Sequence, residues 1–404
     1  MRALLLGQVT LNKVMERLTL LGMGLMGDGR RGRLALLAVV GLAFVALVAW
    51  ALTRHPTGSP DTVQIGAALP LTGDAAVYGQ AIKNGMELAA SQDQARAPKI
   101  TIDYEDDRGL PGSAISAVRR LIDIDHAPAI IAGAMSSTAE PVIPVADRAK
   151  VVLLSPTATK PSLTQISSYF FRLWPSDDYD GKIMAEAAYK KLGIRRVAIL
   201  YINVAYGVGI TQVFTRDFRE LGGIVVASEG YRQGATDFRT MLAKIAAQHP
   251  DAIYLPGYVA EIGNILRQAR ELDIRVRFIG VNSLYDPNLI KIAGDAAEGA
   301  VFTYPTFDVA SGDPTVRNFV TAFRSKFGHD PDAFAAQGYD AYRVVRLALG
   351  RASAFTGPEI RDALHLIGHY SGPGGTFEFD AHGDVAKPLR LMTVRNGHFV
   401  EFME

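Results

Sequence analysis

Short apolar runs alternate with amphipathic segments from Asp61 onward, and this alternation restricts the fold of the chain more than any other feature. The runs are too short for most helices and are typical of buried strands, whereas the segments between them carry apolar residues at helical spacing. Strands are predicted at residues 63–69, 99–104, 129–132 and 151–154, and in a second set at 197–201, 224–228, 252–255 and 278–281. Strands that alternate with helices predict parallel sheets covered on both faces. The pattern occurs twice in 404 residues, so we expect an α/β fold of two doubly wound, Rossmann-like lobes.

Helices are predicted between these strands and after the second set. They cover residues 80–90, 113–122, 182–192, 211–221, 238–247, 262–269, 319–327, 335–349 and 358–366. Pro141 and Pro144 fit an α-helix only near its first turn, so the start of the helix after Ala132 is not fixed by the sequence. The tail at 376–379 and 389–402 is predicted to form strands, with a hairpin turn at Asn396-Gly397.

A different kind of segment precedes Asp61. Residues 34–52 are 19 apolar residues without a charge, and three arginines lie within residues 30–33. This length can cross a bilayer, and the preceding positive charge would stay in the cytoplasm, so the rest of the chain would lie outside. A cleaved signal peptide is the alternative, with a small-x-small pattern at Ala49–Ala51, although the run is long for a signal. We therefore expect residues 1–60 to be a leader or membrane-anchoring hydrophobic helix, followed by a linker.

Hydroxyl-bearing residues follow two of the predicted strands. Ser136, Ser137 and Thr138 come after the strand at 129–132, and Ser155, Thr157 and Thr159 come after the strand at 151–154. In an open parallel sheet, ligands bind outside the carboxyl ends of the strands. Two neighbouring strand ends that carry neutral donors therefore predict a site for a small anionic group without covalent chemistry. Tyr206 and Tyr258 follow two strands of the second set, so they are expected at the same crevice.

Composition and motifs favour a binding protein over an enzyme. The chain has no cysteine and a net charge of +1, which favours neither a thiolate site nor a nucleic-acid partner. It carries no P-loop and no Gly-x-Ser-x-Gly elbow. The pattern Gly22-x-Gly24-x-x-Gly27 follows no predicted strand, and His365 and His369 lack a third ligand. We therefore predict no catalytic residue, no metal and no cofactor. The acidic run at 105–107 is expected in solvent.

Several stretches together resemble one family. They are IGAALPLTGDAAVYGQAIKNGMELA, the SST and SPTAT loops, AYGVG, YLPGYVAEIGNILRQAR and AEGAVFTYP. In order and spacing, residues 61–404 resemble a type I periplasmic solute-binding protein of the leucine/isoleucine/valine-binding family, which serves ATP-driven (ABC) importers. The resemblance implies two lobes joined by three hinge crossings, near 174–177, 304–308 and 380–384. Lobe 1 would comprise 61–176 and 306–382, and lobe 2 would comprise 177–305 and 383–404.

The resemblance also assigns ligand contacts. The family's contacts to the ligand carboxylate fall on Ser136, on Thr157 through its backbone, and on Thr159. The family places an aromatic residue near the ligand in the first loop, which corresponds to Tyr78. Tyr206 and Tyr258 match aromatic positions on the facing lobe. The implied partners are a small amino acid or related ligand outside the cytoplasm, the permease subunits of an ABC importer, and the membrane through residues 34–52.

Asn282 departs from the family pattern. The amino-acid binders of the family use an acidic residue at this position, directly after a strand, to pair with the ligand ammonium. A buried ammonium without a carboxylate partner is costly. Either Asp286 or Glu261, which are nearby in sequence, compensates, or the ligand is a neutral amide or an aromatic or branched carboxylate. A ligand-sensing ectodomain is a further alternative, although only about 33 residues precede the apolar segment and none of them reads as an effector.

Overall fold

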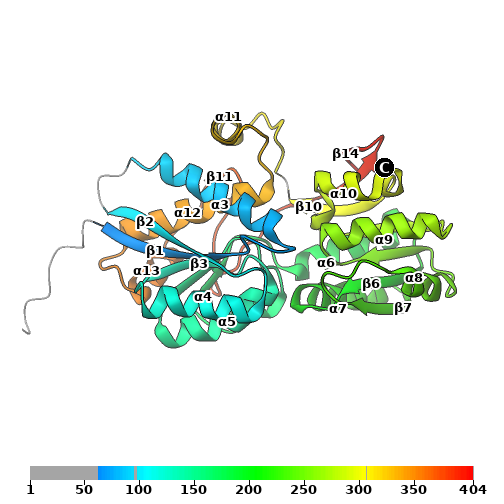
Figure 1. Cartoon of the computed structure of the whole chain (residues 1–404), viewed down its shortest axis with the longest axis horizontal. Coiled ribbons are helices and arrows are strands. Elements are labelled where there is room, and N and C mark those ends of the chain that lie inside the picture. The colour runs from blue at the N-terminus through cyan, green and yellow to red at the C-terminus, as the bar shows by residue number, and fades with distance from the viewer. Residues whose placement is uncertain (1–61, 95–97, 306, 404) are drawn as a thin grey trace, which may run out of the picture. The chain divides into compact units, whose positions relative to one another are not determined.

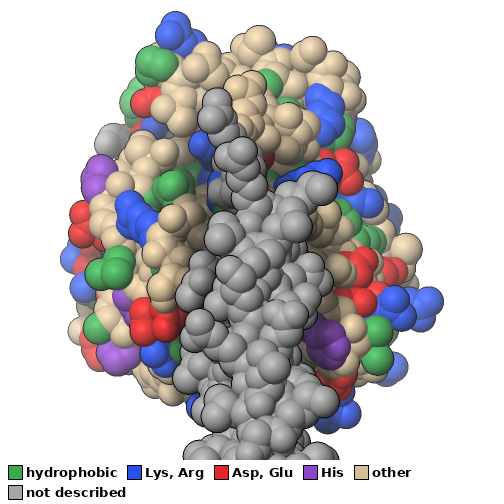
Figure 2. Space-filling model, turned by 90° about the vertical axis from the view of Figure 1, so that its left-hand side faces the viewer, with side chains coloured by type: hydrophobic (Ala, Val, Ile, Leu, Met, Phe, Trp, Pro, Cys, Tyr) green, Lys and Arg blue, Asp and Glu red, His purple; other side chains and the backbone are tan. Residues whose placement is uncertain are grey.

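The computed structural model describes residues 62–94, 98–305 and 307–403 (Figure 1). The predicted hydrophobic helix and linker at 1–60 lie outside the described residues. Within the described ranges, no helix combines the length and the apolar character that are needed to cross a bilayer. On the face shown in Figure 2, basic and acidic side chains are interspersed.

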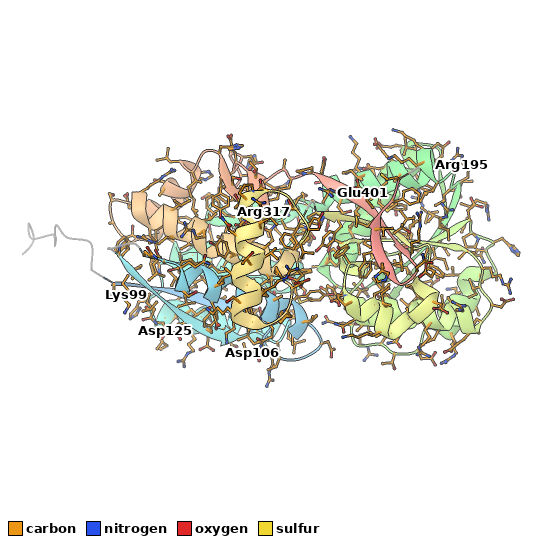
Figure 3. All side chains as sticks on the ribbon, turned by 90° about the horizontal axis from the view of Figure 1, so that it is seen from above. Lys99, Asp106, Asp125, Arg195, Arg317 and Glu401 are labelled. Carbon is orange, nitrogen blue, oxygen red and sulfur yellow. The ribbon has the colours of Figure 1, made fainter. Side chains whose placement is uncertain are left out.

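The first sheet is parallel throughout and has the strand order β2-β1-β3-β4-β5. Its strands are β1 (Thr62–Leu69), β2 (Lys99–Asp106), β3 (Ala129–Ala132), β4 (Val152–Ser155) and β5 (Phe170–Arg172). Figure 3 marks both ends of β2 by the side chains of Lys99 and Asp106. Helices α3 (Ala76–Ser91), α4 (Pro111–Asp123) and α5 (Ser136–Ala149) connect the strands, and a short 3₁₀ helix, η1 (Pro161–Gln165), precedes β5. All residues of β3 and β4 are buried, as expected for strands that are covered on both faces.

The second sheet has the strand order β14-β13-β10-β9-β8-β6-β7. Its strands are β6 (Arg196–Ile202), β7 (Ile224–Tyr231), β8 (Ala252–Leu255), β9 (Arg277–Gly280), β10 (Val301–Pro305), β13 (Leu389–Arg395) and β14 (His398–Glu401). The first five are parallel, whereas β13 and β14 add an antiparallel hairpin beside β10. The associated helical segments are α6 (Asp177–Glu186), η2 (Ala187–Lys191), α7 (Ala205–Glu220), α8 (Arg239–Ala246), α9 (Val259–Glu271), η3 (Asn282–Leu284), α10 (Pro287–Ala293) and η4 (Gly294–Ala297).

The chain passes three times between the two sheets. It leaves β5 for α6, and it returns after β10 to form α11 (Pro314–Phe327), α12 (Ala333–Arg351) and α13 (Gly357–His365). Helix α12 packs along α3 beside the first sheet, and the two run next to each other in Figure 1. After the small hairpin of β11 (Tyr370–Gly372) and β12 (Gly375–Phe377), the chain reaches β13 in the second sheet. The structure thus confirms the α/β fold with two doubly wound lobes and three crossings.

Three local expectations were wrong, and each has a physical reason. Pro141 and Pro144 lie inside α5, past its first turn, although each ring removes one N–H donor of the helix. Helix α6 begins at Asp177 rather than at residue 182, because the Ser176 side chain caps it by accepting from the Asp178 N–H at 3.3 Å. Asp107 is fully buried rather than in solvent, and it accepts a hydrogen bond of 2.7 Å from the Gly109 N–H.

Candidate functional site

The seven residues predicted to bind ligand line one cavity. They are Tyr78, Ser136, Thr157, Thr159, Tyr206, Tyr258 and Asn282. Ser136, Thr157 and Thr159 follow strands of the first sheet, whereas Tyr206, Tyr258 and Asn282 follow strands of the second. Strand ends of both sheets therefore meet at this cavity, as the strand-end argument predicted.

Hydrogen bonds among the hydroxyl residues fix the wall from the first sheet. Ser136 Oγ accepts from the N–H of Thr159 at 3.2 Å and from the N–H of Lys160 at 3.1 Å. The Thr157 hydroxyl donates to the carbonyl of Ala134 at 2.6 Å. The proton of Ser136 Oγ remains available for a ligand, whereas Thr157 can offer only its backbone. Ser136 also begins α5, whose amino-terminal N–H groups favour an anion.

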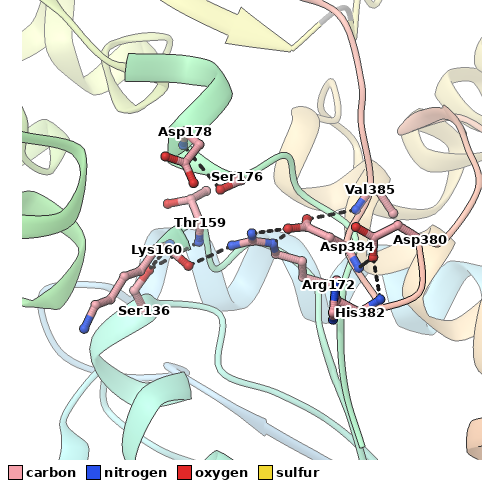
Figure 4. A network of polar contacts seen from close by, with 10 residues as sticks. All are labelled: Ser136, Thr159, Lys160, Arg172, Ser176, Asp178, Asp380, His382, Asp384 and Val385. Atoms are coloured by element: carbon pink, nitrogen blue, oxygen red, sulfur yellow. Dashed lines mark hydrogen bonds and ion pairs between the residues drawn. The ribbon is translucent and has the colours of Figure 1, made fainter. Parts of the chain in front are cut away.

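A buried arginine connects this wall to the third chain crossing. Arg172, which is fully buried, donates to the carbonyl of Lys160 at 2.9 Å and forms a two-bond ion pair with Asp384. Figure 4 shows the resulting network from Ser136 through Lys160 and Arg172 to Asp384. The loop that carries Thr159 is therefore held by a residue of the segment between β12 and β13.

Aromatic rings form the opposite and lateral walls. The rings of Tyr206 and Tyr258 stack with centroids 5.8 Å apart, and Tyr78 lies 5.9 Å from Tyr258. Phe334, near the start of α12, lies 4.8 Å from Tyr78 and completes the wall. Sequence reasoning missed Phe334, because it lies far from the strand ends in sequence and carries no motif. These rings suit an apolar ligand body.

Tyr78 joins the two sides of the cavity. Its hydroxyl accepts a hydrogen bond of 3.2 Å from the N–H of Val259, the first residue of α9. Burial raises the pKa of Tyr78 far above its ordinary range, so the hydroxyl stays neutral. A residue of α3 therefore contacts the helix that follows β8, and this contact spans the two lobes.

Two buried carboxylates lie behind the wall from the second sheet. Asp180 accepts hydrogen bonds from the Thr303 hydroxyl at 2.5 Å and from the Asn282 amide nitrogen at 3.3 Å. Burial raises the pKa of Asp180 to about 6. Asp177 is also fully buried, and burial followed by the charge of Asp180 raises its pKa well above the ordinary value. Sequence reasoning missed both, since the only signal was the acidic first turn of α6.

The two acids considered from sequence are engaged elsewhere. Asp286 caps α10 by accepting from the Asn288 N–H at 2.7 Å. Glu261 accepts from the Gly234 N–H at 2.8 Å. Neither side chain is part of the cavity lining. Across the described ranges, His, Asp and Glu side chains nowhere gather in a group of three or more that could hold a metal ion.

Comparisons with known proteins agree with this geometry. Residues 62–398 match the model of a family described as periplasmic binding protein. The leucine-, isoleucine-, valine-, threonine- and alanine-binding protein of Pseudomonas aeruginosa is 26% identical over 365 residues, which cover 89% of this chain and 94% of that protein.

Solved structures show the same similarity. The leucine-binding protein LivK of Thermotoga maritima is 32% identical with a TM-score of 0.81, and the match covers 84% of this chain and 98% of that one. A solute-binding protein of an ABC transporter from Rhodopseudomonas palustris BisB5, solved with 3,4-dihydroxybenzoic acid, is 26% identical with a TM-score of 0.76. That match covers 85% of this chain and 96% of the other.

Proposed function

Because the chain belongs to the periplasmic binding protein family, we propose that it is the solute-binding component of an ABC importer. It binds a small amino acid or a related carboxylate between its two lobes and delivers it to the permease subunits. The observation that carries this proposal is the cavity between the strand ends of the two sheets, lined by hydroxyl groups on one side and by aromatic rings on the other. Such a lining suits the non-covalent binding of a small ligand.

The roles of the seven residues follow from their surroundings. Ser136 and Thr159, with the backbone of Thr157, bind the ligand carboxylate beside the amino terminus of α5. Tyr78, Tyr206 and Tyr258 enclose the ligand body. Asn282 contributes a polar group from the second sheet. The arrangement supports this division, because the hydroxyl residues follow strands of the first sheet, whereas the stacked rings of Tyr206 and Tyr258 follow strands of the second.

Two ligand classes are represented among the similar proteins. Relatives are named for branched-chain amino acids, and one structural neighbour was solved with an aromatic acid. The amino-acid class is our primary proposal. The aromatic-acid class is the second candidate, and the uncharged Asn282 beside an aromatic wall is the observation that favours it.

The organisation of the chain follows the same proposal. Lobe 1 comprises 61–176 and 306–382, and lobe 2 comprises 177–305 and 383–404. The protein is exported and acts outside the cytoplasm, where residues 34–52 tether it to the membrane or are removed with a signal.

A ligand screen tests the proposal. Thermal unfolding of residues 61–404 is followed with leucine, isoleucine, valine, threonine, alanine, phenylalanine, benzoate and 3,4-dihydroxybenzoate, and each positive result is titrated by calorimetry. A ligand that binds only the folded state raises the melting temperature. We expect at least one of these compounds to bind at micromolar affinity. No binding by any of them would refute the proposed ligand class.

A further inference from the structure

Asp180 holds Asn282 in a defined orientation at the edge of the cavity. An ionised carboxylate can only accept hydrogen bonds, so the amide nitrogen of Asn282 must face it. The amide oxygen of Asn282 is then left as the free polar end of a side chain that lines the cavity, and no described residue donates a hydrogen bond to it. Asn282 therefore presents an acceptor to a ligand, with a carboxylate directly behind it.

Asp177 adds a second buried carboxyl group beside the cavity. Asp177 lies against the loop of Thr159: its N–H donates to the Thr159 carbonyl at 2.8 Å, and a hydrogen bond from the Thr159 side chain offsets part of the rise in the pKa of its carboxyl group. Within the described part of the chain, neither Asp177 nor Asp180 forms an ion pair, and Arg172, the cation that influences Asp177, is paired with Asp384. The electrostatic neighbours of Asp177 include Tyr206 and Tyr258, which line the cavity. Burial without a paired cation opposes the ionised form of both carboxyl groups, and an ammonium group placed beside them would favour that form.

We propose that Asp180, acting through Asn282, and Asp177 together supply the negative charge that binds the ammonium group of an amino-acid ligand. This inference rests on the proposed function and selects within it a ligand that carries both a carboxylate and an ammonium group. The carboxylate of Asp180 lies behind Asn282, the position at which the family's amino-acid binders carry the acid. Asp180 is thus a positioning residue for the acceptor on Asn282 and the source of the field that the ammonium group meets.

The electrostatics distinguish the two ligand classes. In a cavity of low dielectric constant, a carboxylate behind the first layer of side chains still attracts a cation strongly. The same carboxylates repel a ligand that has lost its amino group, because such a ligand carries only negative charge. The ratio of the two affinities therefore reports the charge of Asp180 and Asp177, whereas a purely structural role would change both affinities together.

The experiment compares matched ligands in matched variants by calorimetry. The probes are leucine and 4-methylpentanoate, valine and 3-methylbutanoate, and phenylalanine and 3-phenylpropanoate, each pair differing only in the amino group. The variants are Asp180→Asn and Asp177→Asn, and the control is Asp178→Asn in the same helical turn, whose side chain is 53% exposed. We expect the wild type to prefer the amino acid. Asp180→Asn should reduce amino-acid affinity about tenfold or more, since it removes the charge but keeps the shape. The deaminated acid should bind to it as well as or better than to the wild type, and the control should match the wild type.

Other results would overturn the inference and leave the proposed function intact. One is a wild type that binds the deaminated acids as tightly as the amino acids. Another is an Asp180→Asn variant in which both members of a pair weaken equally. If none of these six probes nor the compounds of the ligand screen binds to the wild type, the proposed function fails and the inference fails with it.

The wild type alone provides a second readout, which does not depend on the folding of a variant. Between about pH 5 and pH 7, amino-acid affinity should rise with pH as Asp180 ionises, and affinity for the deaminated acid should fall. The other titratable or charged groups that influence the two aspartates are Arg172 on β5, Asp178 on α6, Tyr206 on α7, Tyr254 on β8 and Tyr258 before α9. The tyrosines keep their protons in this range, because burial raises their pKa values far above it. Equal slopes for both members of a pair would contradict the inference.

Discussion

Replacing Ser136 with alanine should affect binding and stability at once. The substitution removes the hydroxyl that we propose donates to the ligand carboxylate. A hydrogen bond to a charged group contributes about 1.5–3 kcal/mol, so the dissociation constant should rise roughly 10- to 100-fold. The substitution also removes the acceptor of two backbone N–H groups, those of Thr159 and Lys160. Each buried donor that loses its partner costs about 1–3 kcal/mol, so the ligand-free protein should lose at least about 1 kcal/mol of stability.

Ser137→Ala is the matched control for this prediction. Ser137 lies in the same turn of α5 and is buried, but its hydroxyl accepts from no backbone N–H and instead faces the hydroxyl of Tyr258. Its removal should lower the free energy of unfolding less than Ser136→Ala does, because no backbone N–H loses its acceptor. Calorimetric titration gives the dissociation constants, and urea unfolding of the ligand-free proteins gives the stabilities. Equal affinity and equal stability of Ser136→Ala and the wild type would refute both the proposed contact and the role of Ser136 in holding the loop.

Three further predictions address the framework. Arg172→Lys should lower the free energy of unfolding in urea by about 2–3 kcal/mol, since a lysine cannot form both bonds to Asp384; unchanged stability would contradict this account of the crossing. Gly85→Ala should lower the free energy of unfolding by about 2 kcal/mol or more in the same assay, because a Cβ there would overlap a backbone carbonyl of α12. The control Gly112→Ala, which has open space around it, should leave the free energy of unfolding unchanged. Because the pKa of Asp180 is raised, its contribution to the stability of the ligand-free protein is present below about pH 4 and is lost as the pH rises to about 6. The stability of Asp180→Asn relative to the wild type should therefore rise over this range by up to about 3 kcal/mol, measured by thermal unfolding at several pH values. A difference that stays constant with pH would contradict the raised pKa.

The sequence predicts the sheets well because their signal is local. A strand buried on both faces is a continuous apolar run, and β3 and β8 follow their predicted limits for this reason. The carboxyl ends of such strands gather at one edge by topology, so the hydroxyl loops could be assigned to a common site without a structure. The same argument brought Tyr206 and Tyr258 to the cavity.

Features that depend on tertiary contacts could not be predicted in this way. Helix α5 tolerates Pro144 in its interior because its apolar face packs into the core, where burial outweighs the lost hydrogen bond. Phe334 reaches the cavity only because α12 packs beside α3. Ser136 lines the cavity, but its role as an acceptor for two backbone N–H groups depends on the path of the following loop.

Asn282 shows that one residue in the cavity does not by itself determine which ligand charge the protein accepts. In the sequence alone, an uncharged asparagine at this position argues against a ligand with an ammonium group. Two acids nearby in sequence, Asp286 and Glu261, are the candidates to compensate. In the folded chain, Asp286 and Glu261 are engaged elsewhere, whereas Asp180, which is 102 positions away, hydrogen-bonds to Asn282. Charge complementarity acts over the whole cavity wall rather than at one residue, since a low dielectric constant makes the Coulomb energy large even for a charge one side chain away. A substitution at the contact position therefore removes a charge from the cavity only if no buried neighbour carries one.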